Sequence, residues 1–108
     1  MAYQVRITSR GYEDQRAIVR WWADNRSADQ AAAWYDGLLA KIQSLSSMPE
    51  SHPFAGENPR VSFELRELHY GLGSHTTHRA LFRIVGTTVE VLTVRHVAQA
   101  DIDPDDLD

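Results

Sequence analysis

The sequence predicts an α+β fold, in which a strand and two helices precede a run of antiparallel strands. Three observations lead to this prediction. Apolar residues alternate near the N-terminus, they recur at helical spacing between residues 12 and 46, and after Pro59 they return to a period of two. Elements segregated in this way indicate helices packed on an antiparallel sheet. We therefore expect an N-terminal strand, an antiparallel helical hairpin and then a three-stranded antiparallel sheet.

The first half of the chain contains the strand and the helical hairpin. Residues 3–8 alternate between apolar and polar side chains, which predicts a half-buried strand. Gly11 breaks this pattern, and the spacing of apolar residues then predicts a helix over 12–25. The segment from Ser27 to Gln30 has the form of a capping box, in which the serine oxygen accepts from the Gln30 amide. A second helix is therefore expected over 27–46.

The second half of the chain is expected to form the sheet. Residues 49–59 hold three of the four prolines, so this segment is predicted to be a loop. A strand is then predicted over 62–70. Two more strands, with apolar residues on both faces, are predicted over 78–85 and 88–97 and are joined as a tight hairpin. Because Leu68 interrupts the alternation, we expect a β-bulge there.

The expected core joins one helical stripe to the apolar positions of the strands. Two strands carry apolar residues on both faces, so both faces of the sheet need a cover. The helical hairpin can cover one face, and the C-terminal segment or a partner must cover the other. We predict burial for a set of six residues, Trp34, Leu38, Ile42, Phe82, Ile84 and Leu92.

Length and composition indicate a single small domain. The chain has 108 residues and 43% hydrophobic residues, which is ordinary for one globular domain. We expect residues 1–100 to form that domain and residues 101–108 to form a solvated acidic tail. There is no cysteine, no apolar run long enough to cross a bilayer and no apolar core of a signal peptide. These features predict a soluble cytoplasmic protein that has no membrane partner.

The charge is unevenly distributed along the chain. The formal net charge is −4, which argues against a general nucleic-acid binder. Five acidic residues stand in the last eight positions, so the rest of the chain is nearly neutral. Ten of the eleven cations are arginines, whose planar donor groups suit either oxyanion recognition or ion pairing.

Several classes of site lack their signatures. No cysteine or histidine spacing typical of a metal site is present, no serine lies in a nucleophile elbow, and no glycine-rich phosphate loop opens a helix. We therefore expect neither a metal nor a cofactor.

Arginines on the predicted strands are the remaining candidates. Arg79 and Arg83 share one strand face, and Arg66 on the preceding strand can join them. Arg95 and His96 point to opposite faces, so only one of them can lie beside that pair. Fixed cations in this arrangement can stabilise a phosphoryl transition state, or they can form cross-strand ion pairs with neighbouring glutamates. The sequence leaves both interpretations open.

The order of elements and three sequence motifs resemble those of the RelE/ParE superfamily of type II toxin–antitoxin toxins. The motifs are LREL (65–68), HRALFRI (78–84) and VEVLTVRH (89–96). Together with the tryptophan-containing second helix, they extend the resemblance over nearly the whole chain. It implies a helical hairpin on a curved antiparallel sheet. It also implies growth inhibition, a role in plasmid stabilisation, and neutralisation by a cognate antitoxin that wraps the toxin and can mediate oligomer formation.

The resemblance implies different targets for the two branches of the superfamily. RelE-like members are metal-independent endoribonucleases that cut mRNA in the ribosome, and ParE-like members bind DNA gyrase without catalysis. For the endoribonuclease, the matching positions give Arg79, His96 and Arg95 as catalytic residues. The neighbouring Arg83, Arg66 and Arg60 would bind substrate RNA. The paired lysines of RelE-like members are missing from residues 49–60, and Gln99 replaces a later arginine.

We rank the endoribonuclease first and the gyrase-binding toxin second. A small interaction domain without toxicity, in which the arginines only form ion pairs, is the third reading.

Overall fold

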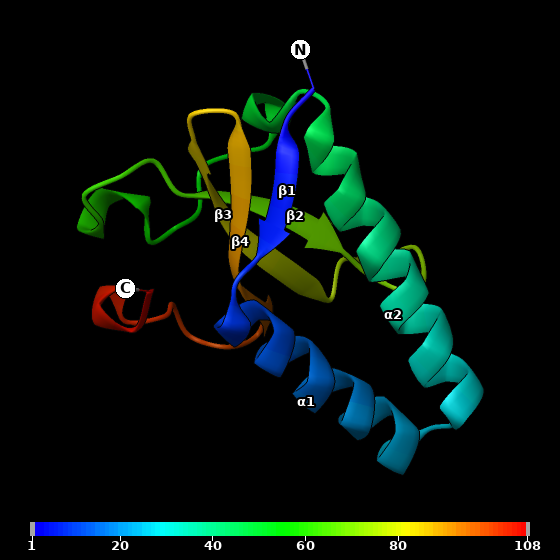
Figure 1. Cartoon of the computed structure of the whole chain (residues 1–108). Helices are drawn as coiled ribbons and strands as arrows, with labels where there is room; N and C mark the ends of the chain where they lie inside the picture. The colour runs from blue at the N-terminus through cyan, green and yellow to red at the C-terminus, as the bar shows by residue number, and fades with distance from the viewer. Residues whose placement is uncertain (1, 108) are drawn as a thin grey trace.

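The computed structural model describes residues 2–107 and confirms the α+β class (Figure 1). A four-stranded sheet has the strand order β1-β4-β3-β2, and two helices follow the first strand in sequence. In the described part of the chain, no helix is both long enough and apolar enough to span a membrane. The elements are β1 (Gln4–Ile7), α1 (Ser9–Asn25), α2 (Ala28–Gln43), β2 (Arg66–Tyr70), β3 (His78–Val85) and β4 (Thr88–His96).

The helical hairpin begins earlier than the sequence predicts. Thr8 caps α1, since its hydroxyl oxygen accepts from the Gly11 amide at 3.2 Å. Gly11 therefore lies inside the first turn of the helix, and the expectation that it precedes the helix is wrong. A Cβ at this position would lie 2.8 Å from Ile7 Cγ2, so glycine permits close packing of α1 on the sheet. The predicted cap of α2 is confirmed, because Ser27 Oγ accepts from the Gln30 amide at 3.1 Å.

The sheet is mixed, because β1 pairs with β4 in parallel whereas β3 is antiparallel to both β4 and β2. The strand predicted over 62–70 is shorter, and only Arg66–Tyr70 joins the sheet. The bulge expected at Leu68 is also wrong, since the pairing of β2 with β3 is regular there. The register shifts instead at Leu81–Phe82, so that Leu92 on β4 is the extra residue between two paired positions.

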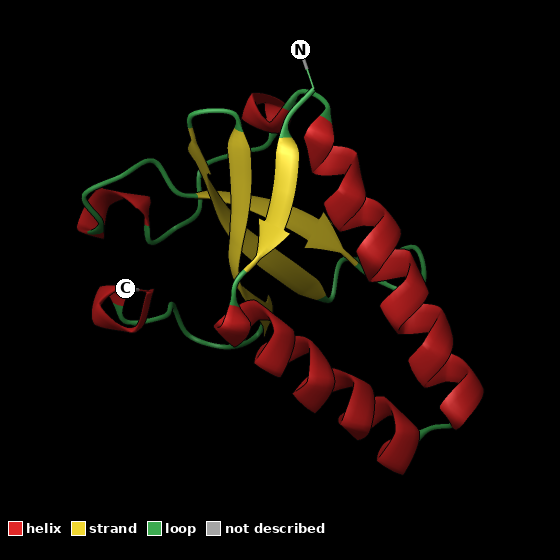
Figure 2. Cartoon of the chain, in the orientation of Figure 1, coloured by secondary structure: helices red, strands yellow, loops and turns green. Residues whose placement is uncertain are grey.

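The helices cover one face of the sheet and form the larger core with it (Figure 2). Trp34, Leu38 and Ile42 form the predicted helical stripe and are buried against Phe82 and other strand residues. Leu92 is also buried, in a second cluster on the opposite face. Ile84 is only half-buried, although it packs against the larger core.

The C-terminal segment covers the opposite face of the sheet together with the proline-rich loop (Figure 1). Ile102 and Leu107 are buried, and the second cluster also holds Leu65, Leu81 and Leu92. The expectation of a solvated tail is therefore wrong for these two residues, because the apolar side chains of the segment fill the uncovered face. Asp108 lies outside the described residues. The loop itself contains two short 3-10 turns, Pro49–Ser51 and Asn58–Arg60.

Candidate functional site

Arg79 lies near the start of β3, on the sheet face that the C-terminal segment covers. It lies on β3 and its side chain is on the same face as Leu81, as the strand alternation predicts. The residue is only 6% exposed. A buried guanidinium requires a nearby acid and hydrogen-bond acceptors, and the proline-rich loop supplies them.

Glu57 from that loop binds Arg79 through both carboxylate oxygens. Arg79 Nη1 donates to Glu57 Oε1 at 2.8 Å, and Nη2 donates to Oε2 at 2.6 Å. Glu57 is 0% exposed, and it also accepts from the Ile102 amide at 2.9 Å. One carboxylate thus connects the loop, the sheet and the C-terminal segment.

The electrostatics of this pair favour the ionised state of both groups. Burial acts to raise the pKa of Glu57, but the hydrogen bonds from Arg79 and the Ile102 amide outweigh it and lower that pKa to about 2. The hydrogen bonds to Glu57 raise the pKa of Arg79. Glu67 Oε1 at 3.5 Å and Asp101 Oδ1 at 3.8 Å add further negative charge around Arg79.

The other predicted site arginines of this face also have partners. Arg83 Nε donates to Glu90 Oε1 at 2.7 Å, and its guanidinium lies over the Phe63 ring. Arg60 pairs with Asp101 at 2.8 Å. Cross-strand and loop ion pairing therefore accounts for these cations.

Arg66 and Arg95 are bound mainly by main-chain oxygens. Arg66 Nη1 donates to the His52 carbonyl at 2.8 Å and its guanidinium stacks on Phe54, while Glu64 lies 4.0 Å away. Arg95 Nη2 donates to the Ala100 carbonyl at 2.9 Å. Arg66 is paired with Phe82 and therefore lies on the other face of the sheet from Arg79 and Arg83, so the expectation that it joins them is wrong. Arg66 fastens the loop to the sheet, and Arg95 fastens the C-terminal segment.

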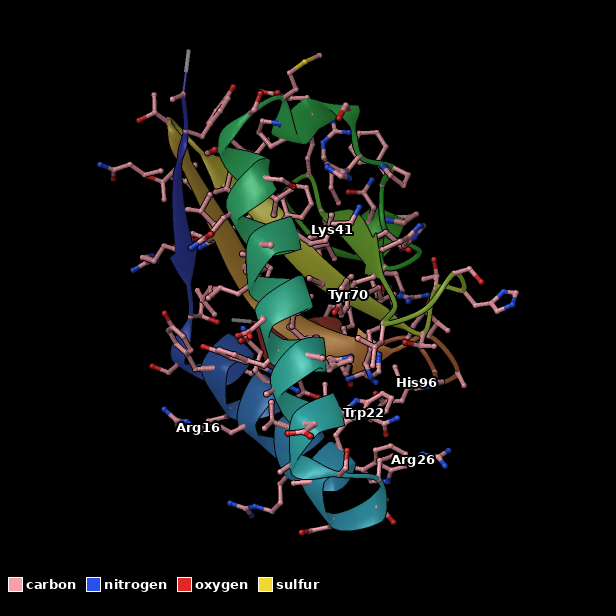
Figure 3. All side chains as sticks on the ribbon, turned by 90° about the vertical axis from the view of Figure 1, so that its right-hand side faces the viewer. Arg16, Trp22, Arg26, Lys41, Tyr70 and His96 are labelled. Atoms are coloured by element: carbon pink, nitrogen blue, oxygen red, sulfur yellow. The ribbon has the colours of Figure 1, made fainter. Side chains whose placement is uncertain are left out.

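His96 is separated from the arginines, as the alternation along β4 predicts. Its ring packs edge to face on His78, with centroids 5.1 Å apart, and Nδ1 accepts from the Ala98 amide at 3.0 Å. Trp22 of α1 lies with His96 on one side of the molecule (Figure 3). The sequence-predicted catalytic set is thus divided between the two faces of the sheet.

The acids that surround Arg79 were not predicted from the sequence. Glu57 stands in a loop without periodicity, and Asp101 stands in the segment interpreted as a solvated tail. Neither residue has a local signal that points to Arg79, because the pairings are tertiary contacts over 22 residues in sequence or more. The site resembles a structural ion-pair network, since the strong donors of Arg79 are already used.

Known proteins resemble this chain both in sequence and in fold. The family model described as the ParE toxin of type II toxin-antitoxin system, parDE, matches residues 5–101. A search of the curated proteins finds no match. Solved structures with similar folds include the following three toxin or toxin–antitoxin structures.

The first is the chromosomal ParDE TA system from P. aeruginosa, with a TM-score of 0.72 and 16% identity, covering 89% of this chain and 97% of that one. The second is a mutant of the E. coli toxin RelE in the free state, with a TM-score of 0.58 and 15% identity over 91% of this chain and 86% of that one. The third is the RelBE2 toxin–antitoxin complex from Mycobacterium tuberculosis, with a TM-score of 0.50 and 24% identity over 89% and 99%. These structures share the fold of this chain.

Proposed function

Because the chain belongs to the ParE toxin family of type II toxin–antitoxin systems, we propose that it arrests growth by binding a target protein, DNA gyrase, rather than by cleaving RNA. The observation that carries this proposal is the bidentate binding of Arg79 by the fully buried Glu57. An arginine that stabilises a phosphoryl transition state needs donors aimed at the reacting oxygens. The donors of Arg79 are aimed at a carboxylate.

The surroundings of Arg79 support the same proposal. Glu67 and Asp101 bring two more carboxylates within 3.8 Å of its guanidinium, which disfavours a phosphate at this position. His96, the predicted acid or base of the endoribonuclease, projects from the other face and packs on His78. An endoribonuclease would need these groups to converge on one phosphate.

Two assays together separate the two modes of action. The purified chain is added to DNA gyrase in a supercoiling assay, and mRNA 5′ ends are mapped by primer extension after induced expression. We expect inhibition of supercoiling and no new mRNA ends. New mRNA ends together with normal supercoiling would contradict this proposal and support the endoribonuclease function instead.

A double variant tests whether the ion pair between Arg79 and Glu57 contributes to the inhibition of gyrase. Arg79→Met combined with Glu57→Gln removes both charges and keeps approximately the same side-chain volumes. We expect the folded double variant to inhibit gyrase as the original chain does. Loss of inhibition in this folded double variant would show that the ion pair itself contributes to toxicity.

We also propose a cognate antitoxin, encoded beside this gene, as the physiological partner. Family membership and the similarity to toxin–antitoxin structures support this partner. Expression of the chain alone should slow growth, and coexpression with the neighbouring open reading frame should restore growth. Harmless expression of the chain, with no small protein copurifying, would contradict the proposal.

A further inference from the structure

The two edges of the sheet differ in how the chain covers them. β2 forms one edge, and the proline-rich loop runs along it, where Glu67 N donates to the Pro53 carbonyl at 2.9 Å. β1 forms the other edge and pairs with β4 on one side. Figure 3 shows β1, in blue, at the border of the sheet. The first edge is therefore covered by the chain itself, whereas β1 leaves the second edge open.

The open edge of β1 presents main-chain groups without partners. Gln4 N donates to the Thr87 carbonyl at 2.9 Å, so the main-chain groups of Gln4 face the β4 side. Successive residues of a strand direct these groups to alternate sides, so those of Val5 and Ile7 face away from β4. Among the described residues, neither of these two amides has a main-chain acceptor beyond the edge. Such unpaired N–H and C=O groups are a template for an added strand.

A hollow lies on each face of the sheet beside this edge. Arg6 shares a face with Glu90, its partner on β4, and both line a hollow of about 700 Å³. Val5 and Ile7 point to the helix face, where β1 and α2 border a second hollow of about 450 Å³. Side chains alternate between the two faces along any strand. A strand added along β1 would thus place its side chains in turn over the two hollows.

The hollow beside Arg6 has an excess of positive charge. Arg6 contacts one carboxylate oxygen of Glu90, and Arg83 Nε donates to the other at 2.7 Å. Since one carboxylate balances only one of these two guanidinium groups, one positive charge remains. The Arg6 side chain is 64% exposed, so its remaining N–H donors can be reached. This hollow therefore fits a carboxylate of the added strand.

The hollow on the helix face has mainly apolar walls. Its lining residues from β1, α1 and α2 include Val5, Ile7, Tyr12, Leu39 and Ile42. Among the described residues that line it, only Arg6 is charged. Burial of apolar surface is favourable here, so this hollow fits an aliphatic side chain.

We propose that β1 accepts an extended segment of a partner protein, with alternating carboxylate and aliphatic side chains, as an additional strand of the sheet. Main-chain hydrogen bonds to Val5 and Ile7 supply affinity, and the two hollows select the alternating side chains. The inference goes beyond the proposed function, because it assigns a docking edge whose occupancy does not require gyrase.

Two other occupants match this edge less well. The phosphates of a nucleic acid are acceptors only, so they offer no donor to the Val5 and Ile7 carbonyls. Antiparallel pairing of β1 with β1 of a second copy would place the two Arg6 side chains opposite each other when both outward residues are paired. Like charges directly opposite each other are destabilising.

The test adds a capped synthetic peptide of alternating valine and glutamate to the isotope-labelled full chain and follows the amide signals by NMR. We expect the Val5 and Ile7 amides to shift and to become protected from hydrogen exchange. A peptide of alternating valine and lysine is the matched probe, and it should bind at least about tenfold more weakly because Arg6 repels it.

Variants of the chain separate the main-chain contacts from the charge. Val5→Pro removes an outward N–H and leaves the hydrogen bonds to β4 in place, so we expect it to abolish binding of the glutamate peptide. Arg6→Gln should raise the Kd of that peptide about tenfold. Arg26→Gln is the matched control, because Arg26 is an exposed arginine at the far end of the helical hairpin and should leave the Kd unchanged (Figure 3).

The inference is overturned if both peptides bind equally well, if the shifts lie away from β1, or if Arg6→Gln and Arg26→Gln behave alike. It is also overturned if light scattering without peptide shows a dimer that Val5→Pro dissociates, since a second copy then occupies the edge. If Val5→Pro does not fold, the map of shifted amides and the two arginine variants still decide. None of these readouts uses gyrase, so a failure here and a failure of the proposed function remain distinguishable.

Discussion

At the scale of single residues, the structure is dominated by the ion pair between Arg79 and Glu57. Taking both charges out of water has a large cost, and only direct hydrogen bonding between them offsets it. The two hydrogen bonds of this pair, with the third from the Ile102 amide, meet that requirement. The pair therefore makes the stability of the fold sensitive to either partner.

We expect Arg79→Met to destabilise the protein by about 3–5 kcal/mol, because it leaves the Glu57 carboxylate buried without its cation. Arg79→Met combined with Glu57→Gln should recover more than half of that loss, since no charge is left unpaired. Denaturant unfolding of the original chain, the single variant and the double variant measures the difference. Equal stabilities of the single and double variants would contradict the prediction.

The pKa of Glu57 predicts how this ion pair responds to acid. Its pKa is about 2 in the folded chain and near the ordinary 4.5 when unfolded. The contribution to stability is thus complete above pH 4.5 and is lost as the pH falls toward 2, by about 3 kcal/mol in all. Glu57→Gln should flatten the stability profile in this range. An unchanged acid dependence in that variant would refute the assignment.

His78 predicts a separate pH effect at milder acidity. Burial keeps its folded-state pKa near 4 instead of the ordinary 6.5, so between these values the unfolded chain binds more protons. Stability should therefore fall as the pH decreases from 6.5 to 4. Denaturation midpoints across this range measure the slope, and His78→Phe should reduce it. A variant that retains the full slope would assign the effect to another group.

The candidate site could be predicted from the sequence only in part. The alternation along a strand correctly placed Arg79 with Arg83 and separated Arg95 from His96. The acids that bind Arg79 and Arg60 most closely come from a loop and from the C-terminal segment, where no periodicity constrains which side chain points inward. The nature of the neighbours, and hence the chemistry available to Arg79, depended on tertiary contacts.

At the scale of elements, α2 packs closely enough on the sheet to depend on one glycine. A Cβ added at Gly37 would lie 2.2 Å from Tyr70 Oη, and Tyr70 donates to the Trp34 carbonyl at 2.9 Å. The helix and β2 are therefore in contact through a tyrosine hydroxyl. Sequence periodicity identified this helix but could not show that one of its positions must lack a side chain.

Gly37→Ala should destabilise the protein by about 1–3 kcal/mol through overpacking, although alanine favours helix by up to about 1 kcal/mol over glycine. Tyr70→Phe removes the hydroxyl, so adding Gly37→Ala in that background should cost less. Chemical denaturation of the four proteins in this cycle gives the coupling. A stabilising Gly37→Ala in the original background would show that Tyr70 moves aside freely.

Periodic elements were predicted well and irregular ones were not. The bounds of β3 agree with the prediction, because its apolar run is delimited by a glycine-rich connection on one side and by the tight turn at Gly86 on the other. The position of Gly11 was predicted wrongly, because a glycine can either break a helix or permit close packing within one. Only the tertiary contacts of the glycine distinguish these two roles.

At the scale of the whole molecule, the C-terminal segment is part of the folded body. Ile102 and Leu107 contribute to the second core cluster, and Arg10 donates to the Asp106 carbonyl at 2.8 Å. The five acidic residues near the terminus led to the prediction of a solvated tail, because composition alone cannot distinguish such a tail from a segment that packs on the sheet. The segment covers the face that the helices leave open.

We expect Ile102→Ala to lower the free energy of unfolding by about 2–5 kcal/mol, as for a buried aliphatic residue in a closed site. Asp105→Asn is the matched control, because Asp105 is exposed in the same segment and should change stability by less than about 0.5 kcal/mol. Thermal unfolding compares the two variants with the original chain. A decrease of less than about 1 kcal/mol in the free energy of unfolding of Ile102→Ala would contradict close packing of the segment on the sheet.

The parallel pairing of β1 with β4 has a consequence for synthesis of the chain on the ribosome. Gln4 pairs with Thr88 and Ile7 pairs with Val91, so the first strand has no place in the sheet until nearly the whole chain has been translated. At about 5–20 residues per second, this wait is on the order of ten seconds. A translation product that ends before Thr88 lacks the partner strand and cannot close the sheet. A truncated message therefore yields a fragment in which β1 has no strand to pair with.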